Sequence, residues 1–292
     1  MKISTSLEHA IGQAGVSARE SARMMKRAGF DGVDLDMCKH QMEPEKLLLP
    51  AWREDILHQA EALKAEGLEI AQCHLPFYPG HIPLPGAGRY EDFEDFMLPE
   101  YMRALEVCRE IGCHTAVMHP FFILGEAQAT WDGNVRMIEK LMPYLKEWKV
   151  RLALENVYGF DGNYADSHMS RGEDIMQVLR RTEAEWVGAC IDTGHANIFR
   201  LPIGDMARLF GKRLFALHVN GNAGKDEHAI PYSMSDWCEC MDFHDFSAAL
   251  KEIGYNGFYN LEIASGPIPR QAAQPFLDYA AAVARGLADE AE

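Results

Sequence analysis

The sequence lacks several features that define whole classes of protein. No apolar stretch approaches the roughly 20 residues that span a bilayer, and no basic start leads into an apolar core at the N-terminus. We therefore expect a cytoplasmic protein with no membrane partner. Basic residues are also scarce, with 28 Lys plus Arg against 44 Asp plus Glu and a formal charge of −16. Because such a chain repels phosphate backbones, nucleic acid is not an expected partner.

The cysteines form no recognisable framework. There are seven, an odd number without regular spacing, which argues against a set of structural disulfides. Cys73 and Cys190 lie in strand-like runs, where reduced and buried thiols are common. A linker rich in Pro, Gly or Ser is also missing, as is any shift in composition. We therefore expect residues 1–292 to form a single domain, and the sequence leaves a homo-oligomer open.

Strand-like and helix-like segments alternate along the chain. Apolar runs predict strands at Lys2–Thr5, Gly32–Met37, Glu69–Leu75, His114–Met118, Arg151–Val157, Val187–Asp192, Leu214–Val219 and Gly257–Ile263. Apolar residues at helical spacing predict helices at Ala51–Glu66, Glu91–Ile111, Thr130–Trp148 and Asp245–Ile253. A first helix is indicated by a capping box at Ser17 and Glu20 and by Gly29, where it should end.

Within four of the predicted strands, a short apolar run ends in a residue type that binds metals. The segments are Leu152–Glu155, Ala189–Asp192, Phe215–His218 and Tyr259–Glu262. Because successive side chains leave opposite faces of a strand, Phe215 is expected to face a helix layer and His218 the shared interior. An unpaired buried carboxylate is very costly, so two Glu, one Asp and one His in one interior need a compensating cation or pairing partners. A divalent metal is the simplest way to satisfy all four together. Oxygen and imidazole ligands without sulfur suit Mn, Mg, Co or Zn.

The eight strand–helix units predict a single (β/α)8 TIM barrel. Right-handed crossovers produce parallel sheets from such alternation, and barrels of this kind take about 250 residues. A doubly wound open sheet is the structural rival. The barrel is preferred because ligands from the last four strands must meet near one point, whereas an open sheet would place them along an edge.

Further candidates for metal or substrate binding fall at the ends of other strands, where barrel enzymes place their chemistry. His74 and His119 end strands three and four, and His195 follows Asp192 by three residues. Asp226 and His228 lie in a long loop, Gly221–Asp242, after the His218 strand. Aromatic residues in the same positions are candidates for the wall of a sugar pocket: Phe77, Tyr78, Phe121, Phe122, Tyr158 and Trp237.

In these short motifs the chain resembles the xylose isomerase-like TIM barrel superfamily, which contains sugar isomerases and epimerases and the family-two AP endonucleases. In the sugar branch the resemblance implies that Glu155, Asp192, His218 and Glu262 bind the catalytic metal. It also implies that Glu155 and Glu262 face opposite sides of the substrate carbon and that His195 contacts substrate oxygens. In the endonuclease branch it implies three zinc ions, two of which would use the following additional ligands: His74, His119, His195, Asp226 and His228.

The resulting hypothesis is a metal-dependent isomerase or epimerase of a keto-sugar or related polyol ketone, phosphorylated or not. The metal would stabilise an enediolate, and Glu155 and Glu262 would transfer the protons. His195 would steady the oxyanion. Three alternatives remain open: a zinc-dependent phosphodiesterase of the AP-endonuclease type, a dehydratase of the same superfamily, and a non-catalytic metal- or carbohydrate-binding barrel. The acidic charge argues against the first.

Overall fold

The strands of the central sheet lie where the apolar runs predict them. The computed structural model describes residues 1–6, 14–37, 41–43, 46–48, 51–78, 90–160, 163–233 and 241–292. Its main sheet contains β1 (Ile3–Ser6), β2 (Gly32–Asp36), β5 (Glu69–His74), β6 (Thr115–Met118), β7 (Arg151–Glu155), β10 (Val187–Asp192), β11 (Leu214–His218) and β12 (Tyr259–Leu261). Two short antiparallel pairs lie outside it, β3 (Gln41–Glu43) with β4 (Lys46–Leu48), and β8 (Gly159–Phe160) with β9 (Tyr164–Ala165).

The main sheet is a nearly closed parallel barrel. Its strand order is β11-β10-β7-β6-β5-β2-β1-β12, and every pairing within it is parallel. The two ends of this order meet in a parallel bridge between Val219 and Leu261, where the Val219 N–H donates to the Asn260 carbonyl at 2.8 Å. The (β/α)8 TIM barrel is therefore confirmed, and the open sheet is excluded.

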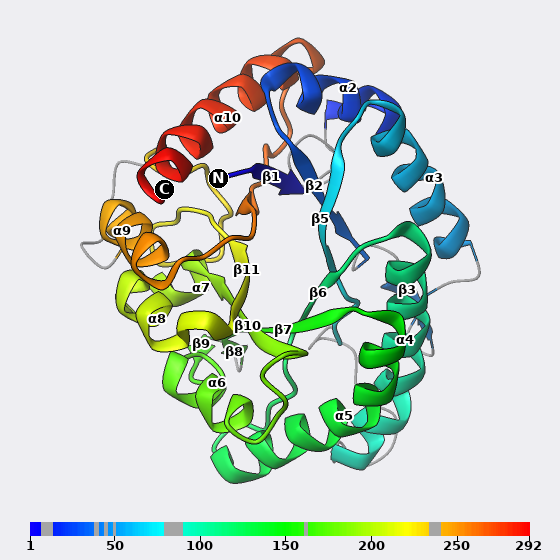
Figure 1. Ribbon diagram of the computed structural model, residues 1–292, viewed down its shortest axis with the longest axis vertical. Coiled ribbons are helices and arrows are strands. Elements are labelled where there is room, and N and C mark those ends of the chain that lie inside the picture. The colour runs from blue at the N-terminus through cyan, green and yellow to red at the C-terminus, as the bar shows by residue number, and fades with distance from the viewer. Residues whose placement is uncertain are drawn as a thin grey trace.

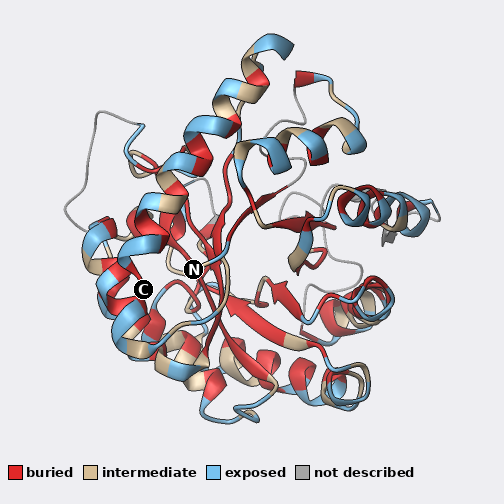
Figure 2. Cartoon of the chain, turned by 45° about the horizontal axis from the view of Figure 1, so that its top comes forward, coloured by how far each residue is buried: buried red, intermediate tan, exposed pale blue. Residues whose placement is uncertain are grey.

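Helices surround the barrel (Figure 1). They are α2 (Ala18–Ala28), α3 (Trp52–Ala65), α4 (Tyr90–Ile111), α5 (Ala127–Trp148), α6 (Gly172–Leu179), α7 (Thr193–Ile198), α8 (Ile203–Phe210), α9 (Phe243–Ile253) and α10 (Ala273–Glu290), with short 3-10 turns at Gly211–Arg213 and Arg270–Ala272. Buried residues fill the strands and the inner faces of the helices, while the outer faces are exposed (Figure 2). No helix in the described part of the chain is both long and apolar enough to cross a membrane.

The start and the end of α2 follow the predicted capping chemistry in part. The Ser17 side chain accepts a hydrogen bond from the Glu20 N–H at 3.3 Å, and Gly29 ends the helix at a φ of 101°. The Glu20 carboxylate does not reach back to Ser17 but binds Arg270 at 2.6 Å. The predicted capping box is thus half formed, because the acidic side chain has a charged partner near the start of the last helix.

The predicted direction of one bulky side chain is wrong. Phe215 was expected to face the helices, but it belongs to a separate interior cluster with Val117, Ala153, Cys190 and Ala216. The register of β10 and β11 shifts here, with Ala189 paired to Leu214 and Cys190 paired to Ala216. This irregularity turns Phe215 into the barrel, where the Arg151 guanidinium lies 4.6 Å from its ring. The alternation resumes afterwards, and His218 faces the interior as predicted.

Candidate metal centre

The structure brings the predicted ligands to one end of the barrel. His74, Glu155, Asp192 and His218 are the last residues of β5, β7, β10 and β11. His119 and Glu262 directly follow β6 and β12. Because neighbouring parallel strands end at the same mouth of a barrel, these side chains meet there. Within this constellation one ligand atom each from Glu155, Asp192, His218 and Glu262 lies within 4.8 Å of the others.

Glu155 lies at the centre of the constellation and is fully buried. Its Oε2 atom is 3.3 Å from His74 Nε2, 3.4 Å from His119 Nε2 and 3.2 Å from His218 Nδ1. Its Oε1 atom is 3.3 Å from His195 Nδ1. Four imidazoles therefore surround one carboxylate, and three of them come from strand ends that are far apart in the sequence.

The donor set fits a divalent cation. Several buried polar atoms among the described residues have no hydrogen bond of good geometry. They are both carboxylate oxygens of Glu155, both ring nitrogens of His218 and the Oε2 atom of Glu262. Native proteins rarely leave so many buried polar atoms unsatisfied in one place. Three carboxylates and one imidazole would hold such an ion without any sulfur ligand, in keeping with Mn, Mg, Co or Zn.

Asp192 has a structural task besides its candidate role as a ligand. Its Oδ1 atom accepts the His195 N–H at 2.6 Å and so caps α7, which begins at the next residue. Its Oδ2 atom accepts from Asn220 at 3.0 Å, and its backbone N–H donates to the Asn156 side chain at 2.8 Å. These contacts fix the carboxylate. The helix α7, which sequence analysis did not predict, in turn places His195 over the barrel mouth.

A second group forms around the loop that follows β11. One ligand atom each of His195, Asp226 and His228 lies within 4.8 Å of the others. His228 Nε2 is 2.9 Å from Asp226 Oδ1, and the Tyr158 hydroxyl donates to Asp226 Oδ2 at 2.7 Å. An antiparallel bridge between Gly221 and Ala229 folds the loop back over the mouth. All nine candidate residues of the sequence analysis therefore converge. Two of the groups share Glu155 and His218, and His119 and His195 each contact Glu155.

Charges in this constellation depend strongly on one another. Burial alone would lower the pKa of His74, but the Glu155 carboxylate raises it to about 9. Burial would also lower the pKa of His228, but Glu262 and Asp226 raise it to about 10. Burial raises the pKa of Asp192 to about 7. Burial would lower the pKa of His218 as well, but the carboxylates raise it well above its usual range, so a cation bound at this ring would compete with a proton for the nitrogen.

Sequence analysis missed a second carboxylate layer beneath the ligands. Asp34 on β2 is buried, and its Oδ2 atom lies 3.3 Å from His218 Nε2, on the side of the ring opposite to Glu155. Gln72 and Asn260 donate to the same oxygen at 2.8 and 3.1 Å. A signal was present, because Asp34 and Asp36 alternate with apolar residues and so share the inner face of β2. Asp34 is therefore placed to orient His218 for metal binding.

We expect Asp34→Asn to lower divalent-metal affinity by about 10- to 100-fold, the usual cost of losing such an outer carboxylate. The amide keeps the size of the side chain but loses the charge that holds the His218 ring. Affinity is measured by calorimetry or by competition with a chelator. Asp132→Asn, on the surface and paired with Arg181, is the matched control and should leave affinity unchanged. Equal affinities for the two folded variants would contradict the assigned role of Asp34.

Two of the candidate aromatic residues line the constellation. The Phe77 ring stacks on His119 at 4.5 Å, and the Tyr158 ring meets His195 at 5.1 Å. Phe121 instead packs against Tyr90 and Phe93 in the helix layer. Tyr78 contacts Phe93 and Phe96 there. Trp237 lies outside the described residues. Phe77 and Tyr158 are therefore the candidates with a ring contact to the histidines of the constellation.

Comparison with known proteins defines the family. The family model described as xylose isomerase-like TIM barrel matches residues 22–282. The chain belongs to this family. An uncharacterized curated protein of Methanocaldococcus jannaschii is 22% identical over 165 residues, a match that covers 54% of this chain and 54% of that protein. The match thus spans about half the length of that relative.

Solved structures of similar fold include several sugar epimerases. L-ribulose 3-epimerase has a TM-score of 0.75 at 17% identity, covering 100% of this chain and 96% of that one. D-allulose 3-epimerase of Methylomonas sp. in complex with D-allulose has a TM-score of 0.70 at 18% identity, covering 100% and 97%. The 3-keto-D-glucoside 4-epimerase of E. coli has a TM-score of 0.66 at 18% identity, covering 90% and 93%. At these identities the likeness establishes the fold alone.

Proposed function

We propose that this protein is a divalent-metal-dependent isomerase or epimerase of a keto-sugar or a related polyol ketone, phosphorylated or not. The observation that carries the proposal is the four-residue group Glu155, Asp192, His218 and Glu262, whose ligand atoms meet at the barrel mouth. Proteins named as ketose 3-epimerases share this fold over nearly their whole length, which supports the choice of substrate class.

The proposed chemistry divides the work between the ion and the protein. The ion, held by the four ligands, supplies Lewis-acid polarisation of the substrate carbonyl, which makes the neighbouring C–H more acidic. Glu262 is 8% exposed whereas Glu155 is fully buried among imidazoles, so Glu262 is the better placed to take the proton from carbon. Glu155 returns a proton on the opposite face for epimerisation, or to the neighbouring carbon for isomerisation.

His195 is proposed to position the substrate oxygen. Its Nδ1 atom lies 2.9 Å from the Asn156 carbonyl oxygen, which holds the ring with Nε2 directed toward Asp226 at 3.7 Å. Burial lowers the pKa of His195, but Asp192 and Glu155 raise it well above its usual range. A cationic imidazole with a fixed orientation is a preorganised donor for an oxyanion.

The experiment that tests this proposal is turnover of a substrate panel by protein of measured metal content. Ketohexoses, ketopentoses, inososes and sugar phosphates are incubated with protein loaded with Mn, Mg, Co or Zn, and products are separated by chromatography. Conversion of a ketose to its epimer or isomer supports the proposal. Sugar binding without conversion across the panel, at full metal occupancy, would place the non-catalytic binding barrel ahead.

A zinc-dependent phosphodiesterase is the second candidate function. The observation that favours it is the convergence of all nine candidate ligands, in particular the separate groups His74, Glu155, His218 and His195, Asp226, His228. Such an arrangement could hold more than one ion, as the two-metal sites of many phosphatases and nucleases do. Metal content separates the two proposals, because one ion per chain favours the sugar chemistry and three zinc ions favour hydrolysis.

We expect no incision of duplex DNA containing an abasic site at moderate salt. With a formal charge of −16, the field of the protein opposes a phosphate polyanion, and binding should be weak at any metal loading. Incision is measured by gel electrophoresis of a labelled duplex with zinc-loaded protein, with an intact duplex as control. Efficient cleavage at the abasic site would promote the phosphodiesterase to first place.

A further inference from the structure

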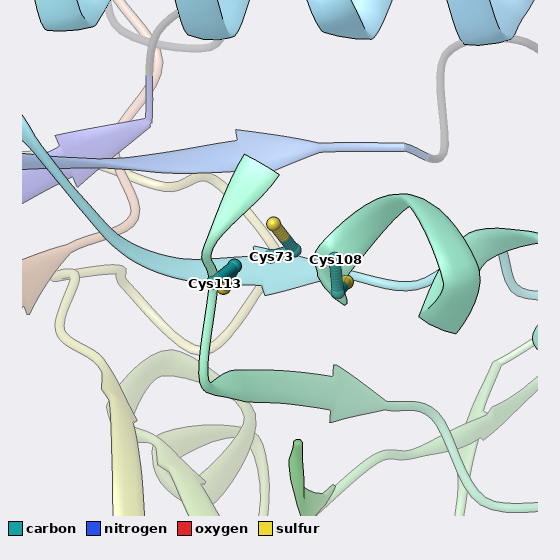
Figure 3. Close-up of side chains that lie close together, drawn as sticks. All are labelled: Cys73, Cys108 and Cys113. Atoms are coloured by element: carbon teal, nitrogen blue, oxygen red, sulfur yellow. The ribbon is translucent and has the colours of Figure 1, made fainter. Parts of the chain in front are cut away.

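A cluster of three buried thiols lies apart from the candidate metal centre. Cys73, Cys108 and Cys113 are each fully buried and free, and their sulfur atoms lie within 4.8 Å of one another. Figure 3 shows that they come from three successive parts of the chain: β5, α4 and the link from α4 to β6. All three belong to the apolar core between the sheet and the helices, not to the barrel interior.

The end of α4 builds two corners of this cluster. The Cys113 N–H donates to the Cys108 carbonyl at 2.8 Å, and the Gly112 N–H donates to the Arg109 carbonyl at 3.2 Å. These two bonds form a Schellman motif, in which Gly112 takes the left-handed conformation at a φ of 76°. The motif commonly brings into contact the side chains at the two positions that Cys108 and Cys113 occupy here. Cys73, on the adjacent strand, completes the triangle.

The donor set and its dimensions suit a three-coordinate thiophilic ion. A thiolate sulfur lies about 2.3 Å from a bound metal such as zinc, so sulfurs on one three-coordinate ion are about 4 Å apart. The cluster therefore needs only a small contraction to close around an ion. Within the described residues, this group of candidate ligands consists of the three cysteine sulfurs alone. Zinc is almost always four-coordinate in structural sites, which makes it a poor match for three thiols.

Charge selects among the thiophilic ions. Three thiolates carry three negative charges, and an uncompensated charge in an apolar core is very unfavourable. A monovalent ion would leave two negative charges and a divalent ion one, whereas a trivalent ion leaves none. We propose that Cys73, Cys108 and Cys113 form a binding site for a trivalent thiophile of the arsenite class.

The binding reaction is balanced without an oxidant. Neutral arsenous acid, As(OH)3, reacts with three thiols to give As(SR)3 and three molecules of water. In each of the three steps an As–S bond replaces an As–O bond, and the S–H proton leaves with the hydroxyl group as water. Arsenic remains trivalent. The thiols are not exposed, so entry requires local opening of the segment around Gly112, an event that native proteins undergo below global unfolding.

The proposal is tested by arsenic stoichiometry on the folded protein. Protein kept reduced is incubated with arsenite, desalted, and assayed for arsenic by mass spectrometry and for thiolate-to-arsenic absorption in the ultraviolet. We expect the wild-type protein to bind one arsenic per chain at the cluster. Each of Cys73→Ala, Cys108→Ala and Cys113→Ala should lower the affinity for that arsenic at least tenfold. The three variants are made separately, so that poor folding of one leaves two others.

Cys190→Ala is the matched control, because Cys190 is equally buried but lies in the barrel interior. It should retain the wild-type arsenic content. Arsenic content that is unchanged in the three cluster variants would overturn the proposal, as would folded wild-type protein that retains none. Tighter binding of Cd or Zn than of arsenite at the same thiols, in direct competition, would overturn the charge argument and with it the trivalent ligand.

Discussion

Glu155→Gln is expected to lower divalent-metal affinity by roughly 100-fold or more, beyond the loss typical of an outer-layer residue. The carboxylate is the central member of the constellation, with four imidazole nitrogens at 3.2 to 3.4 Å. The amide removes the negative charge and turns an N–H2 group toward some of those nitrogens, so both the ion and the histidines lose their partner. Metal content after dialysis and affinity by calorimetry are the measurements.

Two further variants and one control sharpen this prediction. Asp192→Asn and His218→Ala remove other members of the same group and should also weaken metal binding. Glu94→Gln is the matched control, because Glu94 is a buried glutamate on α4 that pairs with Lys140 and Arg136 on α5 and belongs to none of the candidate ligand groups. Circular dichroism establishes that each variant is folded. Full metal occupancy in folded Asp192→Asn and His218→Ala would remove the four-residue group as the metal site.

The barrel and the convergence of its candidate ligands were predictable because strand alternation is a local property. The sequences around Glu155, His218 and Glu262 place bulky residues on one face and the ligand on the other, and the structure keeps that alternation. The direction of Phe215 was not predictable, since it depends on a register shift between two strands. A one-residue irregularity reverses a side chain without leaving a clear mark in the sequence.

The supporting contacts of the site depend on tertiary pairing. Asp34 binds His218 across 184 positions of the chain, and no local pattern specifies that contact. The position of His195 depends on α7, a helix of six residues whose cap is the candidate ligand Asp192. Sequence analysis read Asp192 as a ligand only, and so it did not predict that one carboxylate both starts a helix and faces the constellation.

The nine converging residues do not by themselves choose between sugar chemistry and hydrolysis. Glu155 and His218 are each shared between two groups, so the same side chains could serve one ion and a substrate or several ions. The aromatic rings of Phe77 and Tyr158 beside the histidines offer apolar contact surface next to polar groups, which suits a small polyol. The acidic charge disfavours a polyanionic substrate. The two arguments point toward a sugar, and proton transfer at carbon is what distinguishes that chemistry.

Glu262→Gln is expected to suppress proton transfer at carbon by about 10²- to 10⁴-fold, the usual contribution of a positioned acid or base. Burial raises the pKa of Glu262, but His218 and His228 more than offset this and lower it to about 2. The group is therefore an ionised carboxylate at neutral pH. The amide keeps an oxygen that can face an ion but cannot accept the proton.

The measurement is incorporation of solvent deuterium next to the carbonyl, with a ketose that the panel identifies as a substrate. Product formation is followed in parallel, because direct return of an unexchanged proton would hide the label. Asp192→Asn at saturating metal is the matched control, since Asp192 is a candidate ligand with no proposed proton-transfer role. We expect this control to retain exchange that Glu262→Gln loses at equal metal occupancy and similar sugar affinity. Equal loss in both variants would assign Glu262 to metal binding alone, and unchanged exchange in Glu262→Gln would move the base to another residue.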